Sequence, residues 1–194
     1  MWKSHFMPRP LKSASLEPVH VVNKTTDLPK AAAYRELQGQ LAALFAGERS
    51  ALANMANMSA VLYEALPDVN WAGFYLLHGH ELVLGPFQGK VACVRIPVGS
   101  GVCGAAAERR ETVIVEDVHA FPGHIACDTA SRSEIVVPLI QSGRLLGVLD
   151  VDSPNLARFD REDGIGLQGA VDHLLQSTDL RPFSNPSAPE QLRD

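Results

Sequence analysis

Apolar residues recur three and four positions apart in two segments near the N-terminus, a spacing typical of helices with one buried face. The first segment runs from residue 28 to about residue 46 and the second from 49 to 66. A third long helix is predicted to start after Asp160, a residue type that caps helix N-termini well. A short helix over 102–110 follows a glycine-rich bend.

Between these helices the pattern changes to short apolar runs separated by turn residues, which is typical of strands joined in hairpins. The predicted strands are 69–77, 81–88, 91–98, 112–115, 134–140 and 145–152. Adjacent hairpins imply antiparallel pairing, and long helices without their own core must pack on a sheet. We therefore predict an α+β fold with a central antiparallel sheet and long helices on one face.

The periodic region spans one domain, residues 28–177, between segments that lack sustained periodicity. Residues 1–27 are predicted to be a flexible extension and residues 178–194, which contain three prolines, a loose tail. The first sixteen residues carry three bases and no acid, which faintly resembles a transit peptide. Two prolines there interrupt an amphipathic helix, so a plain extension is favoured.

Composition removes several classes of function. The net charge is −5 and the basic residues are scattered along the chain. The sequence therefore does not predict the clustered basic surface with which proteins usually bind nucleic acid. The chain contains no apolar run near the roughly 18–20 residues of a membrane span. Three cysteines are too few, and odd in number, for a secreted disulfide scaffold, so we expect a cytoplasmic protein.

The connection over residues 116–132 is long for a compact domain, and loops of this length are often functional. It contains His119, His124 and Cys127 in a polar setting. Neighbouring His or Arg side chains stabilise a thiolate, so Cys127 is a candidate nucleophile, the alternative being an incidental cysteine in a solvated loop. These residues lack the spacing of a zinc site, and no metal is predicted.

The other two cysteines have two interpretations. Cys93 lies within a predicted strand and Cys103 just after the glycine bend, where either can be simple core packing. Together with Cys127 they also fit an attacking thiol and one or two resolving thiols. Spacing along the chain does not tell which pair comes within disulfide reach, so both remain candidates.

Two residue pairs in the predicted strands each share one face of the sheet. Asp150 and Asp152 alternate along the last strand on the same side as Val148, so this face can begin in the core and end in a pocket. Trp71 and Tyr75, four residues apart in the first strand, also share a face. Paired carboxylates in a pocket can hold an ammonium group or raise each other's pKa.

A competing motif lies at Gly99–Gly104, which matches G-x-G-x-x-G after a predicted strand and before a helix. The helix must end near Arg110, because the next strand starts at residue 112. That segment is too short for the helical crossover of a dinucleotide-binding unit. Dinucleotide binding is therefore not expected.

At these residues the sequence resembles the free methionine-(R)-sulfoxide reductases, a catalytic branch of the GAF fold. The similarity covers roughly residues 30–177. Its motifs are NWAGFYLL at 70–77, LGPFQGKVACVRIPVGSGVCGAA at 84–106, HIACD at 124–128, SEIVVPLI at 133–140 and GVLDVDSP at 147–154. Three cysteines separated by ten and then twenty-four residues are specific, because most GAF sensor domains lack them.

The resemblance implies a GAF fold whose ligand pocket is covered by loops on the sheet face opposite the helices. It implies that Cys127 is the nucleophile and leaves open whether Cys93 or Cys103 is the resolving thiol. The residues that match the family's substrate pocket are Trp71, Tyr75, Glu134, Asp150 and Asp152.

The implied reaction is reduction of free L-methionine-(R)-sulfoxide through a Cys127 sulfenic acid and an intramolecular disulfide. Thioredoxin or another external dithiol would restore the thiols, and no cofactor is needed. One of the three acids would protonate the sulfoxide oxygen while the others pair with the substrate ammonium, and Trp71 would pack on the methyl group.

Two other classes of function compete with this one. A GAF sensor module would bind a small ligand without chemistry, but such modules normally belong to longer chains with an output domain. A structural domain would use the first helices to form a homodimer, which does not exclude catalysis. Turnover of free methionine sulfoxide separates the reductase from both.

Overall fold

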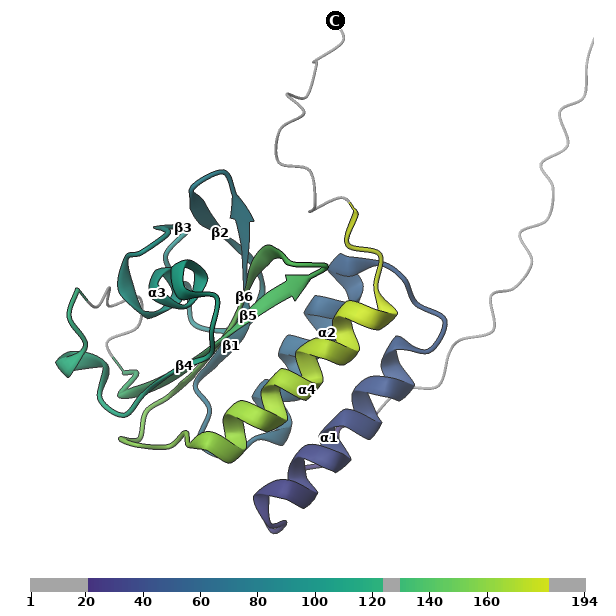
Figure 1. Ribbon diagram of the computed structural model, residues 1–194. Helices are drawn as coiled ribbons and strands as arrows, with labels where there is room; N and C mark the ends of the chain where they lie inside the picture. Colours follow the sequence, from purple (N-terminus) through teal and green to yellow (C-terminus); the bar gives the residue numbers. More distant parts are fainter. Residues whose placement is uncertain (1–20, 124–129, 182–194) are drawn as a thin grey trace, which may run out of the picture.

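Six antiparallel strands form a single sheet in the order β3-β2-β1-β6-β5-β4 (Figure 1). The computed structural model describes residues 21–123 and 130–181. The strands are β1 Trp71–His78, β2 Glu81–Gly89, β3 Arg95–Pro97, β4 Val113–Val115, β5 Ser133–Gln141 and β6 Arg144–Ser153. The helices are α1 Lys30–Phe45, α2 Ala51–Ala65, α3 Gly101–Arg109 and α4 Arg161–Ser177, with a 3₁₀ turn, η1, at Val118–Ala120. The predicted α+β fold with an antiparallel sheet is confirmed.

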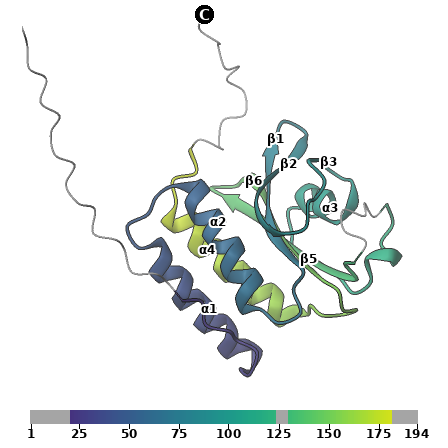
Figure 2. The same ribbon diagram turned by 180° about the vertical axis from the view of Figure 1, so that it is seen from behind.

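The sheet separates two hydrophobic clusters. On one face α1, α2 and α4 form a layer, whereas α3 and the loops around it lie on the other face (Figures 1 and 2). Residues Leu149 and Val151 of β6 pack with the long helices, and Val148 packs on the opposite side with α3. The alternation predicted for this strand is therefore confirmed, and it directs Asp150 toward the α3 side.

Helix α4 is fixed at its start by a capping box. The Asp160 side chain accepts from the backbone of Glu162 and Asp163, and the Asp163 side chain accepts from the Asp160 N–H. Lys30 of α1 bonds to both acids, which ties the two helices together. The capping role predicted for Asp160 is confirmed.

One predicted strand is wrong over half its length. The segment 91–98 was expected to be continuous strand with Cys93 in its middle, but only Arg95–Pro97 pairs with β2, and Cys93 lies in the connection before it. No regular ladder forms before Arg95, because the Lys90 and Cys93 carbonyls accept from the Trp71 and Tyr75 side chains of β1. The Val94 carbonyl accepts from a backbone N–H of β2, that of Leu84. Apolar composition alone does not distinguish these two situations.

The glycine motif at Gly99–Gly104 does not open a nucleotide-binding unit. Helix α3 has nine residues and leads into β4, which pairs antiparallel with β5. Every strand pair of the described residues is antiparallel, so this part of the chain has no parallel crossover. The described strands therefore do not form the parallel unit in which this motif binds a dinucleotide.

The described residues on either side of the predicted domain pack against it. Thr25 is buried, and both its N–H and its hydroxyl donate to the carbonyl of Ala65. After α4, Leu180 is buried in the core, and the Asp179 N–H donates to the Arg49 carbonyl. None of the described helices is long and apolar enough to span a membrane.

Candidate active site

Three neighbouring strands place acidic and aromatic residues in one row on the α3 side of the sheet. Trp71 of β1 lies opposite Asp152 of β6, and Asp152 lies opposite Glu134 of β5. Two residues further along β1, Gly73 lies opposite Asp150. Because residues directly opposite in a sheet point to the same face, Trp71 and the three acids converge. Tyr75 stacks on Trp71 on the same face, so the structure brings together all five residues implied as the substrate pocket.

Helix α3 adds a thiol to this cluster. Cys103 is buried and free, and its Sγ–H donates to Glu134 Oε1 at 3.8 Å. The Sγ of Cys103 and one oxygen each of Glu134 and Asp150 lie within 4.8 Å of one another. This spacing suits a cation, either an ammonium group or a metal ion, although the role proposed below requires no metal.

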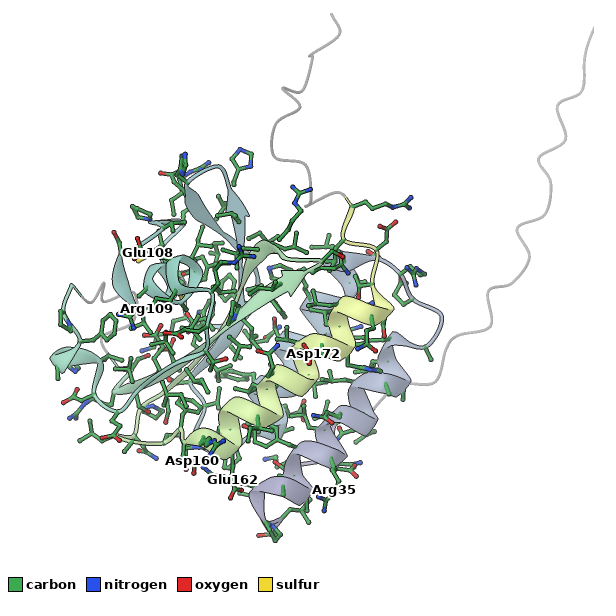
Figure 3. All side chains as sticks on the ribbon, viewed as in Figure 1. Arg35, Glu108, Arg109, Asp160, Glu162 and Asp172 are labelled. Atoms are coloured by element: carbon green, nitrogen blue, oxygen red, sulfur yellow. The ribbon has the colours of Figure 1, made fainter. Side chains whose placement is uncertain are left out.

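Burial dominates the electrostatics of the two inner acids. Glu134 and Asp150 are each 6% exposed, whereas the charged residues labelled in Figure 3, such as Glu108 and Arg109 on α3, are exposed. Desolvation raises the pKa of Asp150 to about 7. Burial, reinforced by the neighbouring Asp150 charge, raises the pKa of Glu134 well above its ordinary value. The pair therefore retains a proton near neutral pH.

The same burial affects the Cys103 thiol and one oxygen of Asp150. Burial and the two acids raise the pKa of the Cys103 thiol well above its ordinary value, so Cys103 stays protonated. Asp150 Oδ1 is buried without a hydrogen-bond partner among the described residues. An orphaned buried oxygen is costly to the fold and is common where a ligand supplies the missing partner.

Aromatic rings form one side of the cluster. The Trp71 ring is stacked with Tyr75 at 5.9 Å and with Phe87 of β2 at 5.3 Å between centroids. Gly73 leaves the space for this stack, since a Cβ there would lie 2.3 Å from the Phe87 Cβ and 2.8 Å from the Trp71 ring. Phe87 and Gly73 were missed in the sequence, although the β1–β2 hairpin register could have pointed to them.

The same aromatics hold the segment that carries Cys93. The Trp71 indole N–H donates to the Lys90 carbonyl, and the Tyr75 hydroxyl donates to the Cys93 carbonyl, each at 3.1 Å. Cys93 is disulfide-bonded, in contrast with the free thiol of Cys103. The structure thus distinguishes two cysteines that spacing along the chain left equivalent.

Part of the candidate loop 116–132 is also described. The Asp117 side chain caps η1 by accepting from the His119 N–H, and the Val118 N–H donates to the Arg132 carbonyl, which closes the base of the loop. The predicted nucleophile Cys127 and its neighbour His124 lie outside the described residues.

The chain is similar to known proteins of the GAF domain family. A model of the GAF domain family matches residues 55–174. The free methionine-R-sulfoxide reductase of Escherichia coli is 57% identical over 153 residues, which cover 77% of this chain and 93% of the relative. The protein of that name from Saccharomyces cerevisiae is 45% identical over 150 residues, 73% of this chain and 83% of the relative.

Solved structures that resemble this chain include proteins of the same name as these relatives. The free methionine-R-sulfoxide reductase of Neisseria meningitidis, solved with its substrate, is 48% identical with a TM-score of 0.78. That match covers 82% of this chain and 95% of the other. A substrate complex from Staphylococcus aureus is 46% identical with a TM-score of 0.72, covering 81% of this chain and 99% of the other.

Proposed function

Because the chain belongs to the GAF-domain family of free methionine-R-sulfoxide reductases, we propose that it reduces free L-methionine-(R)-sulfoxide to L-methionine. The observation that carries the proposal is the buried Cys103–Glu134–Asp150 cluster beside Trp71. A buried acid pair that retains a proton is unusual in a purely structural setting, and it suits a reaction in which a weakly electrophilic oxygen must be protonated.

The substrate's two ends have partners of matching chemistry. Asp152 is less buried than Asp150 and lies beside Trp71, so it suits the ammonium group of a free amino acid. A peptide-bound methionine lacks that charge, which gives preference for the free amino acid. The Trp71 ring provides an apolar contact for the S-methyl group.

The acid pair supplies the proton that activates the sulfoxide. Glu134 and Asp150 share it near neutral pH, and the unpartnered Asp150 Oδ1 provides a position for a polar group of the substrate. Protonation of the sulfoxide oxygen makes the sulfur electrophilic. General acid catalysis of this kind contributes about 10²- to 10⁴-fold to rates.

Cys127 is the proposed nucleophile. Its thiolate forms a bond to the substrate sulfur, the protonated oxygen is transferred to the cysteine sulfur, and methionine leaves with Cys127 as a sulfenic acid. A second thiol then attacks the Cys127 sulfur and expels the hydroxyl group as water, giving a disulfide. Two electrons pass from the two thiols to the sulfoxide, and an external dithiol restores them.

We assign the resolving role to Cys93 rather than Cys103. Cys93 is the cysteine that is disulfide-bonded, and it lies in an irregular segment outside the strands. Cys103 is a free thiol on α3 whose pKa is raised by burial and by the adjacent acids. A thiol kept protonated is a poor nucleophile, so Cys103 serves the acid pair instead.

The test is turnover of free L-methionine-(R)-sulfoxide with dithiothreitol or thioredoxin. The unmodified protein is expected to turn over, and Cys127→Ser is expected to be inactive. Cys93→Ser should still form methionine once but lose thioredoxin-supported cycling, whereas Cys103→Ser should keep cycling. An active Cys127→Ser enzyme would refute the nucleophile, and ligand binding without turnover by the unmodified protein would favour a sensor module.

A further inference from the structure

We infer that the exposed residues Val91 and Val94, which flank Cys93, form a docking site for a protein dithiol reductant of the thioredoxin type. The inference rests on the proposed function, because it concerns the step that returns the Cys93 disulfide to thiols. It adds to that step the surface on which the reductant binds.

The side chains of the two valines are strongly exposed to solvent. Five large hydrophobic side chains of the described residues are at least 64% exposed, and two of them are Val91 at 87% and Val94 at 64%. Both lie within two residues of the disulfide-bonded cysteine. Two exposed apolar side chains on either side of a disulfide-bonded cysteine offer an apolar contact to a protein that approaches this sulfur.

The segment that carries the valines is held in place by its backbone. Its carbonyls accept from Trp71 at Lys90, from Tyr75 at Cys93, and from the Leu84 N–H at Val94. These bonds leave the two valine side chains outside the protein. A partner therefore meets a preformed surface and loses little entropy in ordering it.

The chemistry of the reduction selects the class of partner. A thiolate of the reductant attacks one sulfur of the disulfide, forming a mixed disulfide and releasing the other cysteine as a thiolate. The second thiol of the reductant then attacks the mixed disulfide, leaving the reductant oxidised and both cysteines of this protein reduced. A protein reductant must seat its own surface around the attacked sulfur, which apolar side chains favour. A small dithiol needs no such surface.

The test measures the rate at which thioredoxin reduces the disulfide of the oxidised protein, with no sulfoxide present. Thioredoxin reductase regenerates the thioredoxin, and the oxidation of NADPH reports the rate. For Val91→Asp with Val94→Asp, we expect kcat/KM for thioredoxin to fall by about ten-fold or more, since two apolar contacts are lost. The rate of reduction by dithiothreitol should stay within about two-fold. Val91→Thr with Val94→Thr keeps β-branched, uncharged side chains, and we expect a fall of about three-fold for it.

A matched control is Leu52→Asp on α2, because Leu52 is 66% exposed and lies on the helical side of the sheet. It should be reduced by thioredoxin like the unmodified protein. Unchanged thioredoxin kinetics in both valine variants would overturn the inference, as would an equal loss with dithiothreitol, or failure of thioredoxin to reduce the unmodified protein. Absence of sulfoxide turnover with dithiothreitol would instead refute the proposed function and leave this result standing.

Discussion

Replacing Asp150 by Asn should stabilise the protein at neutral and alkaline pH while it slows the reaction. The folded protein raises the pKa of this buried carboxyl from 3.8 to about 7, chiefly through desolvation. Asn has nearly the same shape and carries no charge, so it removes the cost of holding an anion in the core.

The direction of the pH dependence follows from proton uptake on folding. Because its folded pKa lies above the unfolded one, the contribution of Asp150 to stability is fully present below about pH 4. That contribution falls as the pH rises to about 7 and does not fall further above it. The complete loss is about 4 kcal/mol. Between pH 5 and pH 8 the remaining part is about 2–3 kcal/mol, and Asp150→Asn should not lose it.

The assay is urea unfolding of both proteins at pH 5 and pH 8, in the same redox state. The stability difference between Asp150→Asn and the unmodified protein should increase by about 2–3 kcal/mol toward pH 8. Over the same range the first-turnover rate of the variant should be lower by about 10²-fold, because the acid pair has lost its proton donor. A stability difference that does not change with pH would refute the buried-acid reasoning, whatever the rate.

Two further predictions test the packing around the site and the helices. Gly166→Ala should destabilise the protein by about 1–3 kcal/mol in urea unfolding, because its Cβ would lie 2.1 Å from the Tyr34 ring. Gly39→Ala, at an open position of α1, should instead stabilise it by about 0.5–1 kcal/mol, and equal effects would contradict the packing argument. Trp71→Phe keeps a ring but loses the bond to the Lys90 carbonyl, so the KM for sulfoxide should rise a few-fold. Trp71→Ala should lower kcat/KM far more, and similar values for the two variants would show that the ring makes no contact with substrate.

The fold was largely predictable because its signals are local. The helical spacing before Gly47, the Asp160 cap and the alternation of Val148 and Asp150 each depend on a few neighbouring residues. The same alternation placed the two aspartates of β6 on one face before any strand pairing was known. These parts of the prediction agree with the structure.

The rest depends on contacts between distant residues. The segment around Cys93 has strand-like composition, yet the Trp71 and Tyr75 side chains bind its carbonyls, and no local pattern encodes that. Cys93 and Cys103 were equivalent in the sequence, because only their environments distinguish a disulfide-bonded sulfur from a thiol buried beside two acids. The contribution of Glu134 likewise depends on the pairing of β5 with β6.

The most direct test of the account is a single-turnover measurement on the prereduced protein without external reductant. Each chain should release one L-methionine from free L-methionine-(R)-sulfoxide, and Cys127→Ser should release none. A peptide-bound sulfoxide should yield little. Release of no methionine by the unmodified protein, or an equal release by Cys127→Ser, would contradict the account.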